Sequence, residues 1–401
     1  MKALIDRGIR KAAARLAGAV LLSCMLAPSP ASADTTWTVT GHGFGHGVGM
    51  SQYGAYGYAL HGMDYRFMLA HYYQGTTIGT APPGRVRVLL TIARGDVTFK
   101  KATTACGRSL NPTRSYRAHL NGGAVQLLSD HGGTLANCGA KLRATGKGRV
   151  RIRGNGAYRG ALVAVPASGG GSLNVVNAIS VDKYVQGVIA GEMPSSWPID
   201  ALKAQAVAAR SYALSSTVHG AGFNLYDDTR SQVYNGIAGE TAATNKAAIA
   251  TKGQVVMYGG EIAHTYYSAS SGGQTESVQF GFPGSAAVPY LVGVDDPYDT
   301  TSPLHTWRKT FTQGQIEAKL GGFLKGNLQD IQITKTGVSP RIVSADIVGS
   351  GGTTKVSGSE LQTALGGYST WMTFSHGGAT QPTGGGSGGS GGNTGGGQPS
   401  G

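Results

Sequence analysis

Residues 191–220 read GEMPSSWPIDALKAQAVAARSYALSSTVHG and carry the strongest helix signal in the chain. Ser195 and Ser196 can cap a helix, and Pro198 suits its first turn. Good helix formers then fill the body up to Gly220. One face repeats small residues that allow close packing, at Ala206, Ala209 and Ala213. The stretch therefore predicts a helix at the centre of the fold, buried by its neighbours.

Strand patterns surround this helix. Short apolar or alternating runs, separated by Gly, Asn and Asp, occupy about residues 83–170 and predict antiparallel strands. Residues 173–190 predict a strand followed by a helical turn or two, and an Ala-rich stretch predicts a second helix near 240–252. The fold class is therefore α+β. We expect a mixed, β-rich domain over residues 34–374, with a central buried helix and an inserted antiparallel β subdomain.

The two ends of the chain differ in composition from this domain. Residues 1–33 combine a basic start, an apolar run and the sequence Ala-Ser-Ala before Asp34, the pattern of a cleaved secretory signal. A less favoured alternative makes Cys24 a lipoprotein cleavage site. Residues 375–401 are rich in Gly, Ser, Thr and Pro and predict a flexible tail. The protein is thus expected to be secreted and extracytoplasmic, with no stable membrane span.

The chain is basic, with a formal net charge of +14. Cleavage after residue 33 removes five basic residues and one aspartate, which leaves +10. A basic surface attracts polyanions, and for an exported protein these are cell-wall polymers and anionic lipid. Lys and Arg do not cluster as in a nucleic-acid groove, and no recognition motif for nucleic acid is present. Nucleic acid is therefore not an expected partner.

The mature chain keeps two cysteines, Cys106 and Cys138. An even pair in an oxidising compartment favours a disulfide, here closing a loop of about 30 residues, over a metal site or a nucleophile. No histidine or further cysteine lies near either one at ligand spacing. We expect the pair to be structural.

Residues 41–53 read GHGFGHGVGMSQY, with glycine at every second position up to Gly49. If the stretch is extended, His42 and His46 lie on one face about 13 Å apart, too far to share a metal ion. The glycine face would let another strand or a sugar ring approach the backbone closely. A short helix or two is expected to follow.

Four blocks of the sequence together resemble the SpoIID/LytB-domain family, named for a sporulation protein acting on peptidoglycan and for an amidase enhancer. They are GHGVGMSQYGA at 45–55, VIAGEMPSSWPIDALKAQAVAARSYAL at 188–214, DDTRSQVYNG at 227–236, and YYSASSGGQTES with PYLVGVDDPYD within 266–299. The resemblance implies an extracytoplasmic, cell-wall protein that acts on peptidoglycan. It also implies a lytic transglycosylase in which the glutamate of the EMP motif, Glu192, is the catalytic acid.

Two features depart from the family pattern. In better-known members the GHGVGMSQ block follows the last β section, whereas here it comes first, which suggests a circular permutation. Such an order requires the region around residues 37–53 to dock beside the chain near Phe374. Some members also bind zinc through His and Cys at the loop that here reads YSASSGG from Tyr267. Neither ligand type is present there, so no metal and no cofactor is expected.

Glu192 is one of six glutamates and stands between an apolar run and Met193-Pro194. Desolvation there should raise its pKa toward a value useful for acid and base chemistry. The amino end of the following helix would lower it, because its partial positive charge favours the carboxylate. The alternative role for Glu192 is to cap that helix near Trp197.

The same blocks supply the other candidate site residues. His46, Ser51 and Gln52 are expected to contact glycan, with His46 as a second proton-handling group. Substrate binding is also assigned to Asp228, Gln232, Tyr234 and Ser271, and to Arg210. For the 227–234 cluster, a sugar-binding role and a solvated turn are both open. For Arg210, which lies roughly 20 Å up the predicted helix from its start, structural and substrate roles are equally open.

Two further patterns are weaker. Asp295, Asp296 and Asp299 invite a calcium interpretation, but their spacing lacks a full ligand loop. Ser270 and Ser271 precede two glycines, yet there is no G-x-S-x-G motif and nothing assigns a His/Asp pair to them.

Three functions follow from these observations. The leading one is a peptidoglycan lytic transglycosylase, in which one carboxylate suffices because the muramyl C6 hydroxyl is the internal nucleophile. The second is a non-catalytic wall-binding protein that stimulates a separate cell-wall amidase. The third is a true hydrolase, in which an aspartate from 227–228 or 295–299 supplies the second carboxylate. In each case the expected partner is the peptidoglycan glycan strand.

Overall fold

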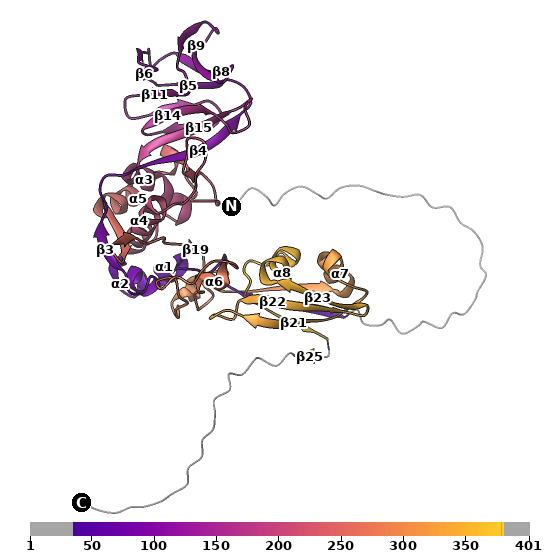
Figure 1. The fold of residues 1–401 in the computed structure, drawn as a ribbon. Helices are drawn as coiled ribbons and strands as arrows, with labels where there is room; N and C mark the ends of the chain where they lie inside the picture. The colour runs from indigo at the N-terminus through magenta and orange to yellow at the C-terminus, as the bar shows by residue number, and fades with distance from the viewer. Residues whose placement is uncertain (1–34, 378, 381–401) are drawn as a thin grey trace, which may run out of the picture.

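The computed structural model describes residues 35–377 and 379–380 (Figure 1). The predicted signal segment 1–33, Cys24 within it, and most of the predicted tail lie outside these residues. The fold combines helices with strands that form several sheets, which agrees with the predicted α+β class. Within the described residues no helix is both long and apolar enough to cross a membrane.

Two antiparallel sheets form the β region at the top of Figure 1. The first has the order β10-β9-β8-β5-β12-β13, with bounds β5 (Val97–Lys100), β8 (Ser115–Asn121), β9 (Ala124–Ser129), β10 (Thr134–Asn137), β12 (Val150–Ile152) and β13 (Gly156–Tyr158). The second has the order β16-β4-β15-β14-β11-β6-β7, with bounds β4 (Arg85–Ala93), β6 (Thr104–Ala105), β7 (Arg108–Ser109), β11 (Leu142–Thr145), β14 (Ala161–Pro166), β15 (Leu173–Ser180) and β16 (Leu225–Tyr226). Two strands from beyond residue 170, β15 and β16, thus complete the second sheet, and β16 pairs in parallel with β4.

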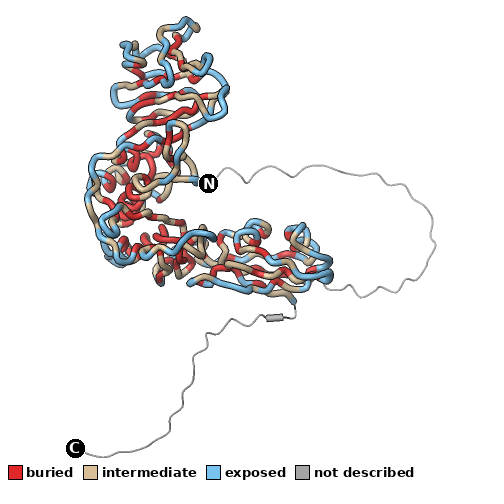
Figure 2. Tube along the Cα trace, viewed as in Figure 1, coloured by how far each residue is buried: buried red, intermediate tan, exposed pale blue. Residues whose placement is uncertain are grey.

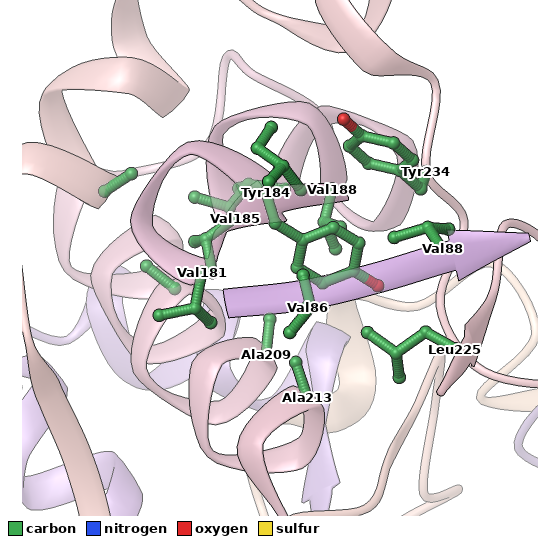
Figure 3. Close-up of a cluster of buried hydrophobic side chains, with 14 of the residues drawn as sticks. Val86, Val88, Val181, Tyr184, Val185, Val188, Ala209, Ala213, Leu225 and Tyr234 are labelled. Atoms are coloured by element: carbon green, nitrogen blue, oxygen red, sulfur yellow. The ribbon is translucent and has the colours of Figure 1, made fainter. Parts of the chain in front are cut away.

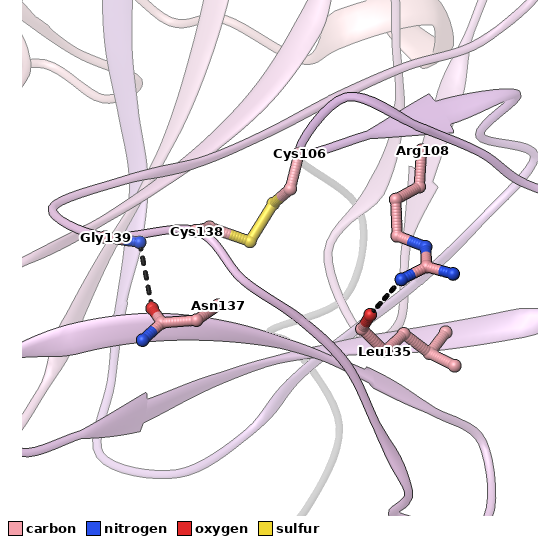
Figure 4. Close-up of a disulfide and its surroundings, with 6 residues drawn as sticks. All are labelled: Cys106, Arg108, Leu135, Asn137, Cys138 and Gly139. Carbon is pink, nitrogen blue, oxygen red and sulfur yellow. Dashed lines mark hydrogen bonds between the residues drawn. A yellow bond between two sulfur atoms is a disulfide. The ribbon is translucent and has the colours of Figure 1, made fainter.

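The predicted disulfide is present in this β region. Cys106 and Cys138 are bonded, with their Cα atoms 5.5 Å apart (Figure 4). Nearby, the Arg108 guanidinium donates to the Leu135 carbonyl and the Gly139 N–H donates to the Asn137 side chain. The bridge therefore joins the β6–β7 turn to the end of β10.

The centre of the molecule is helical, with α3 (Val181–Glu192), α4 (Ile199–Leu214), α5 (Ala242–Ala250) and the 3-10 turn η1 (Gly236–Gly239). Most of α4 is buried, as predicted, and Pro198 is its N-cap residue. The helix ends at Leu214, before the predicted end at Gly220. The Ser215 hydroxyl bonds to His264 and the Ser216 hydroxyl donates to the Asn224 carbonyl, contacts that hold this segment outside the helix.

Apolar residues of α3, α4 and β4 pack together in this centre (Figure 3). Val181, Val185 and Val188 follow the helical period and face the buried side of α3. Alanines on α4 let the two helices approach closely, and the continuous red segments in Figure 2 show how fully they are enclosed. α3 is 12 residues long, whereas the sequence predicted a turn or two.

A second group of elements lies below this centre in Figure 1. It comprises α1 (Gln52–Leu60), α2 (Tyr65–Tyr72), the sheet β18-β17-β3 with β3 (Thr77–Thr80), β17 (Gln254–Tyr258) and β18 (Glu261–Ile262), the parallel pair β2 (Met50–Ser51) and β19 (Tyr267–Ser268), α6 (Val278–Gly281) and the 3-10 turn η2 (Asp299–Thr301). The group is thus built from two segments far apart in the sequence, residues 50–80 and 254–301.

The last section has a separate core of its own. Its elements are the sheet β20-β1-β24-β25, with β1 (Thr36–His42), β20 (Thr306–Thr312), β24 (Met372–His376) and β25 (Ala379–Thr380), the sheet β21-β22-β23, with β21 (Leu328–Thr336), β22 (Ile342–Gly349) and β23 (Gly352–Ser357), and α7 (Gln313–Leu320), η3 (Gly321–Phe323) and α8 (Gly358–Leu365). β1 lies between β20 and β24, and Val39 pairs with Phe374. Ser375 and His376 continue β24, so the sheet extends past residue 374, where the tail was predicted to begin.

Candidate active site around Glu192

Glu192 is the last residue of α3, and its side chain is half-buried. Its Oε1 atom accepts a 2.7 Å hydrogen bond from the backbone N–H of Val233. Its Oε2 atom lies 3.5 Å from the side-chain amide of Gln52, a long contact. The capping role considered from the sequence is therefore wrong, because α4 begins at Ile199 with Pro198 as its N-cap residue.

The environment of Glu192 favours its protonated form. Burial raises its pKa above the ordinary value, and hydrogen bonds from Val233, Gln52 and the Tyr267 side chain partly offset that rise. The sequence led us to expect a helix amino end beside this carboxyl group. The structure places it at the carboxyl end of α3, where the helix dipole disfavours an anion.

A buried chain of hydrogen bonds reaches Glu192 from the helical core. The Tyr184 hydroxyl donates to the Gln232 carbonyl at 3.0 Å, and the Gln232 amide donates to the Tyr267 hydroxyl at 2.9 Å. Because that hydroxyl accepts from Gln232, its own proton is directed to another acceptor, and Glu192 is its partner. Gln232 is almost fully buried, so its predicted role as a sugar ligand is wrong. It instead orients Tyr267, which the sequence analysis did not single out.

Three aromatic rings from the same two chain segments as Gln52 and Glu192 pack against one another. Trp197 stacks on Tyr56 with ring centroids 4.6 Å apart and meets Tyr53 edge-on at 5.0 Å. Tyr53 follows Gln52 on α1, and Trp197 lies five residues after Glu192. All three rings keep part of their surface exposed. The sequence analysis did not assign them to the site, although the EMPSSWP motif already carried the tryptophan.

A polar groove of about 630 Å³ borders the same part of the chain. Ala190 and Ser195, on either side of Glu192 in the sequence, line it together with Asp227 and Asp228. Burial raises the pKa of Asp227 to about 6. Asp228 is partly exposed and forms an ion pair with Arg230 at 2.7 Å, a geometry that leaves both a sugar ligand and a solvated turn open.

Tyr234 does not have the predicted sugar-stacking role. It is 3% exposed and packs in the core beside α3 (Figure 3). Its hydroxyl donates to the Asn177 side chain at 2.7 Å. This buried hydrogen bond explains why the core accepts a tyrosine here.

Two roles were open for Arg210, structural or substrate-binding, and its contacts are structural. It is fully buried, and its Nε donates to Asp182 at 2.9 Å. Its other nitrogens donate to backbone carbonyls of Ala206, Ala248 and Gln254. The guanidinium therefore joins α3, α4, α5 and β17, and it is not a substrate-binding residue.

The glycine-rich stretch is not regularly extended after β1. The glycines at 43, 45, 47 and 49 all have positive φ, between 72° and 101°, which side-chain-bearing residues rarely adopt. Bridges join Phe44 to Ser270 and Val48 to Glu276. A Cβ at Gly43 would lie 2.7 Å from the Ser270 carbonyl oxygen. The close approach predicted for these glycines is thus made by the protein's own 266–276 segment and not by a sugar ring.

His46 and Ser51 belong to this packed stretch. The Ser51 hydroxyl caps α1 by accepting from Gly54 N–H and donates to Asp299 at 2.7 Å. The His46 Nδ1 atom accepts from Val48 N–H, and its ring contacts those of Tyr266 and Phe282. Burial and the nearby Arg341 lower the pKa of His46 to about 4. Neither side chain contacts Glu192, so the structure does not support His46 as its proton-handling partner or Ser51 as a glycan ligand.

Two of the three aspartates considered for calcium, Asp296 and Asp299, accept hydrogen bonds from protein donors, and the third, Asp295, is exposed. Asp299 is fully buried and accepts from the Ser51 and Ser270 hydroxyls and from two backbone N–H groups. Asp296 accepts from the Tyr72 and Ser271 hydroxyls, and burial raises its pKa to about 7. The Ser271 hydroxyl donates to a carboxylate in a fully buried position, which is incompatible with its predicted contact with substrate. Within residues 35–377, no cluster of three or more His, Cys, Asp or Glu is placed to hold a metal ion.

Of the residues predicted for the site, the structure brings Gln52 to Glu192. This contact joins the first sequence block to the second across 140 residues. Together with the pairing of Val39 and Phe374, it shows the docking that the unusual order of the blocks requires.

Comparison with known proteins supports the family resemblance. Residues 169–258 match the family described as SpoIID, Stage II sporulation protein. This segment runs from the start of β15 to the end of β17 and includes Glu192 and α4.

Curated relatives align over similar lengths. The amidase enhancer of Bacillus subtilis (strain 168) is 41% identical over 135 residues, which cover 34% of this chain and 18% of that protein. Stage II sporulation protein D of the same organism is 32% identical over 191 residues, covering 43% of this chain and 55% of the relative. An uncharacterized protein of Brachyspira hyodysenteriae is 35% identical over 169 residues, covering 41% and 45%. The chain thus spans roughly a fifth to just over half of the length of these relatives, and it carries a SpoIID-family region.

Proposed function

We propose that this protein is a cell-wall protein of the extracytoplasmic space that cleaves peptidoglycan glycan strands, with Glu192 as general acid and base. The observation that carries the proposal is the setting of Glu192. It is a half-buried carboxyl group with a raised pKa, oriented by Val233, Gln52 and Tyr267. The partly exposed rings of Tyr53, Tyr56 and Trp197 come from the same two chain segments as Gln52 and Glu192. Aromatic faces of this kind offer a flat apolar surface to a ligand, and a sugar ring matches it.

The chemistry needs one carboxyl group. Protonated Glu192 donates its proton to the glycosidic oxygen while the bond from that oxygen to C1 breaks. The resulting carboxylate then accepts the proton of the muramyl C6 hydroxyl, whose oxygen bonds to C1. The products are an anhydro-muramyl end and a new free hydroxyl, and Glu192 is protonated again. No water is consumed.

The raised pKa of Glu192 suits the first step, because a larger fraction of the carboxyl group is protonated at a given pH. The Val233 N–H and the Gln52 and Tyr267 side chains stabilise the carboxylate that forms during it. The same three donors hold the carboxyl group in one orientation for the second step.

The test is product analysis on purified glycan strands. Wild-type protein is expected to give anhydro-muramyl ends detectable by mass spectrometry, and Glu192→Gln is expected to lose at least about 100-fold in rate. Glu261→Gln, on the exposed strand β18, is the matched control and should retain the wild-type rate. If Glu192→Gln cleaves as fast as this control, the assignment is wrong.

A second candidate function rests on the 41% identity to a protein named amidase enhancer. In that case the protein binds the wall and accelerates a separate amidase without cleaving glycan itself. The expected result is then no new glycan ends, together with faster peptide release when an amidase is added. Glu192→Gln would keep this stimulation if the carboxyl group has no chemical role.

The hydrolase alternative depends on Asp227. This half-buried carboxyl group, with its pKa near 6, borders the groove that Ala190 and Ser195 also line. A hydrolase would release reducing ends in place of anhydro ends, so the same mass spectra distinguish it. Asp227→Asn should then abolish cleavage as completely as Glu192→Gln.

A further inference from the structure

Positive charge is concentrated in the β region. Residues 83–170 contain fifteen Lys and Arg against two Asp and no Glu, a net charge of +13 out of the chain's +14. The basic residues were not expected to cluster, but the fold places these fifteen at one end of the molecule, the top of Figure 1. A field of one sign over one region attracts a polyanion to that region.

A wide groove of about 1040 Å³ opens on the outer face of the six-stranded sheet. Its lining includes Lys100 from β5, Arg117 from β8, and Arg151 and Arg153 at β12. The alternation of the strands explains why these side chains share a face. Phe99 and Ile152 point into the core, so their neighbours Lys100 and Arg151 point outward.

Among the described residues, Lys100, Arg151 and Arg153 form no ion pair. Two carboxylates, Asp96 and Asp130, also line the groove, and Asp130 lies 3.5 Å from His131. Lys100 and Arg151 are directly opposite each other across two paired strands, and Arg153 follows on the same face. Arg117, by contrast, is held by Asp96 at 2.9 Å. Like charges directly opposite each other destabilise a sheet. An anion bound between the Lys100 and Arg151 side chains would remove this repulsion.

This basic groove meets the groove beside Glu192. Asn155, in the turn between β12 and β13, lines both. Its side chain donates to the Leu90 carbonyl and accepts from the Tyr158 hydroxyl, which fixes the turn at the junction. One extended ligand can therefore follow both grooves.

We propose that the groove lined by Lys100, Arg151 and Arg153 binds an anionic stretch of the same glycan strand that is cleaved at Glu192, through the carboxylates that this strand carries. The choice of occupant rests on the proposed function and on the junction at Asn155. A phosphate polymer of the wall could bind the basic groove by charge alone, and it would have no need of the groove that continues past Asn155 toward Glu192. The guanidinium groups of Arg151 and Arg153 can each pair with a carboxylate through two parallel hydrogen bonds, and the Lys100 ammonium can pair with another as a point charge on a flexible stem.

Binding of peptide-stripped glycan strands to the full chain tests this proposal. The Glu192→Gln background prevents cleavage during the measurement. In that background, Lys100→Glu with Arg151→Glu should weaken binding about tenfold or more at low ionic strength, and added salt should shrink the difference. Strands whose carboxylates have been methyl-esterified should bind the parent as weakly as native strands bind the double variant.

Arg87→Glu with Arg143→Glu is the matched control, since it changes the net charge equally on exposed positions of the seven-stranded sheet that do not line the groove. Its binding should change by less than about threefold. Equal weakening in both double variants would overturn the proposal in favour of overall charge. Unchanged binding in the groove variant would overturn it as well.

Cleavage assays separate this site from the catalytic one. With Glu192 intact, the groove variant should cleave short glycan oligomers at the parental rate and long strands more slowly. If neither the parent nor the groove variant cleaves glycan, the proposed function fails, while the binding measurements still test whether the groove binds glycan.

Binding to poly(glycerol phosphate) tests the choice of occupant. If the groove variant loses binding to this polymer and keeps its binding to glycan, the occupant is a phosphate polymer and our choice is overturned. Thermal unfolding of each double variant checks that it is folded.

Discussion

Replacing Gly49 by alanine should destabilise the protein strongly. Gly49 has a φ of 72°, and an added Cβ would lie 2.1 Å from the Tyr266 carbonyl oxygen and 3.1 Å from the Tyr73 ring. That carbonyl cannot move freely, because it accepts hydrogen bonds from Met50 N–H and from the Tyr73 hydroxyl at 3.2 and 2.8 Å. The substitution therefore meets a fixed backbone group.

Two contributions set the magnitude. A side-chain-bearing residue in the left-handed region loses about 1–2 kcal/mol. Forcing a methyl group into a filled site costs about 1–3 kcal/mol more. The free energy of unfolding should thus fall by about 2–5 kcal/mol, a large part of the roughly 5–15 kcal/mol typical of a folded domain.

Two other glycines isolate these contributions in urea titrations followed by tryptophan fluorescence. Gly62 has a φ of 81° with no atom within 4 Å of an added Cβ, so Gly62→Ala should lose about 1–2 kcal/mol from the backbone alone. Gly95 is equally open and has no positive φ, so Gly95→Ala should change stability by less than about 1 kcal/mol. Equal losses for Gly49→Ala and Gly62→Ala would refute the argument from the Tyr266 carbonyl.

Three other perturbations test separate parts of the fold. Arg210→Met removes the buried guanidinium from Asp182 and three carbonyls, and should lower the unfolding free energy by about 3 kcal/mol in the same titrations. For His46, a pKa of about 4 in the folded state lies below its unfolded value, so the unfolded state binds the proton first as pH falls. Wild type should therefore lose up to about 3 kcal/mol relative to His46→Gln between pH 6.5 and 4, and none above pH 7. Replacing Cys106 and Cys138 by serine should destabilise the β region by about 3–4 kcal/mol, since it opens a loop of 32 residues.

Each of these three predictions has a control or an outcome that would contradict it. Lys203→Met breaks a surface ion pair with Asp200 and should lose less than about 1 kcal/mol, in contrast to Arg210→Met. A His46→Gln curve parallel to wild type from pH 7 to pH 4 would contradict the burial of His46 as the cause of its low pKa. Cysteine variants that melt at the wild-type temperature would show that the β region does not depend on its disulfide.

Features encoded by neighbouring residues were predictable from the sequence. The alanine-rich helix α4 follows from local composition, and the disulfide follows from an even number of cysteines. The predicted capping by Ser195 or Ser196 is wrong, because Pro198 is the N-cap residue and no side chain of the described residues caps the helix. Glu192 and Gln52 were also named in advance, through a family resemblance that no periodicity could supply. Their contact spans 140 residues and depends on the tertiary fold.

The errors share a different physical cause. Ser51 and Ser271 were predicted to contact substrate because they lie in the blocks that carry the family resemblance, yet both donate to buried carboxylates. Ser51 and its acceptor Asp299 lie 248 residues apart, and nothing local to either residue indicates the pairing. The alternating glycines were compatible with an extended strand until the structure showed their positive φ angles. Sequence pattern identifies a residue type that permits a conformation, but the tertiary partner decides which conformation is used.

The position of β1 at the centre of its sheet affects the order in which the chain can fold. β1 is made early in synthesis, whereas its partners β20 and β24 lie 270 and 333 residues away, as the Thr38–Arg308 and Thr40–Thr373 hydrogen bonds show. Closing such long loops precedes any gain from pairing, and contacts of this kind slow folding. The β region and α4 can form from local contacts first, but the Gln52–Glu192 contact waits until the segment holding Gln52 has docked. The candidate site is therefore assembled late, and the early strand remains open to non-native pairing until the last strand is available.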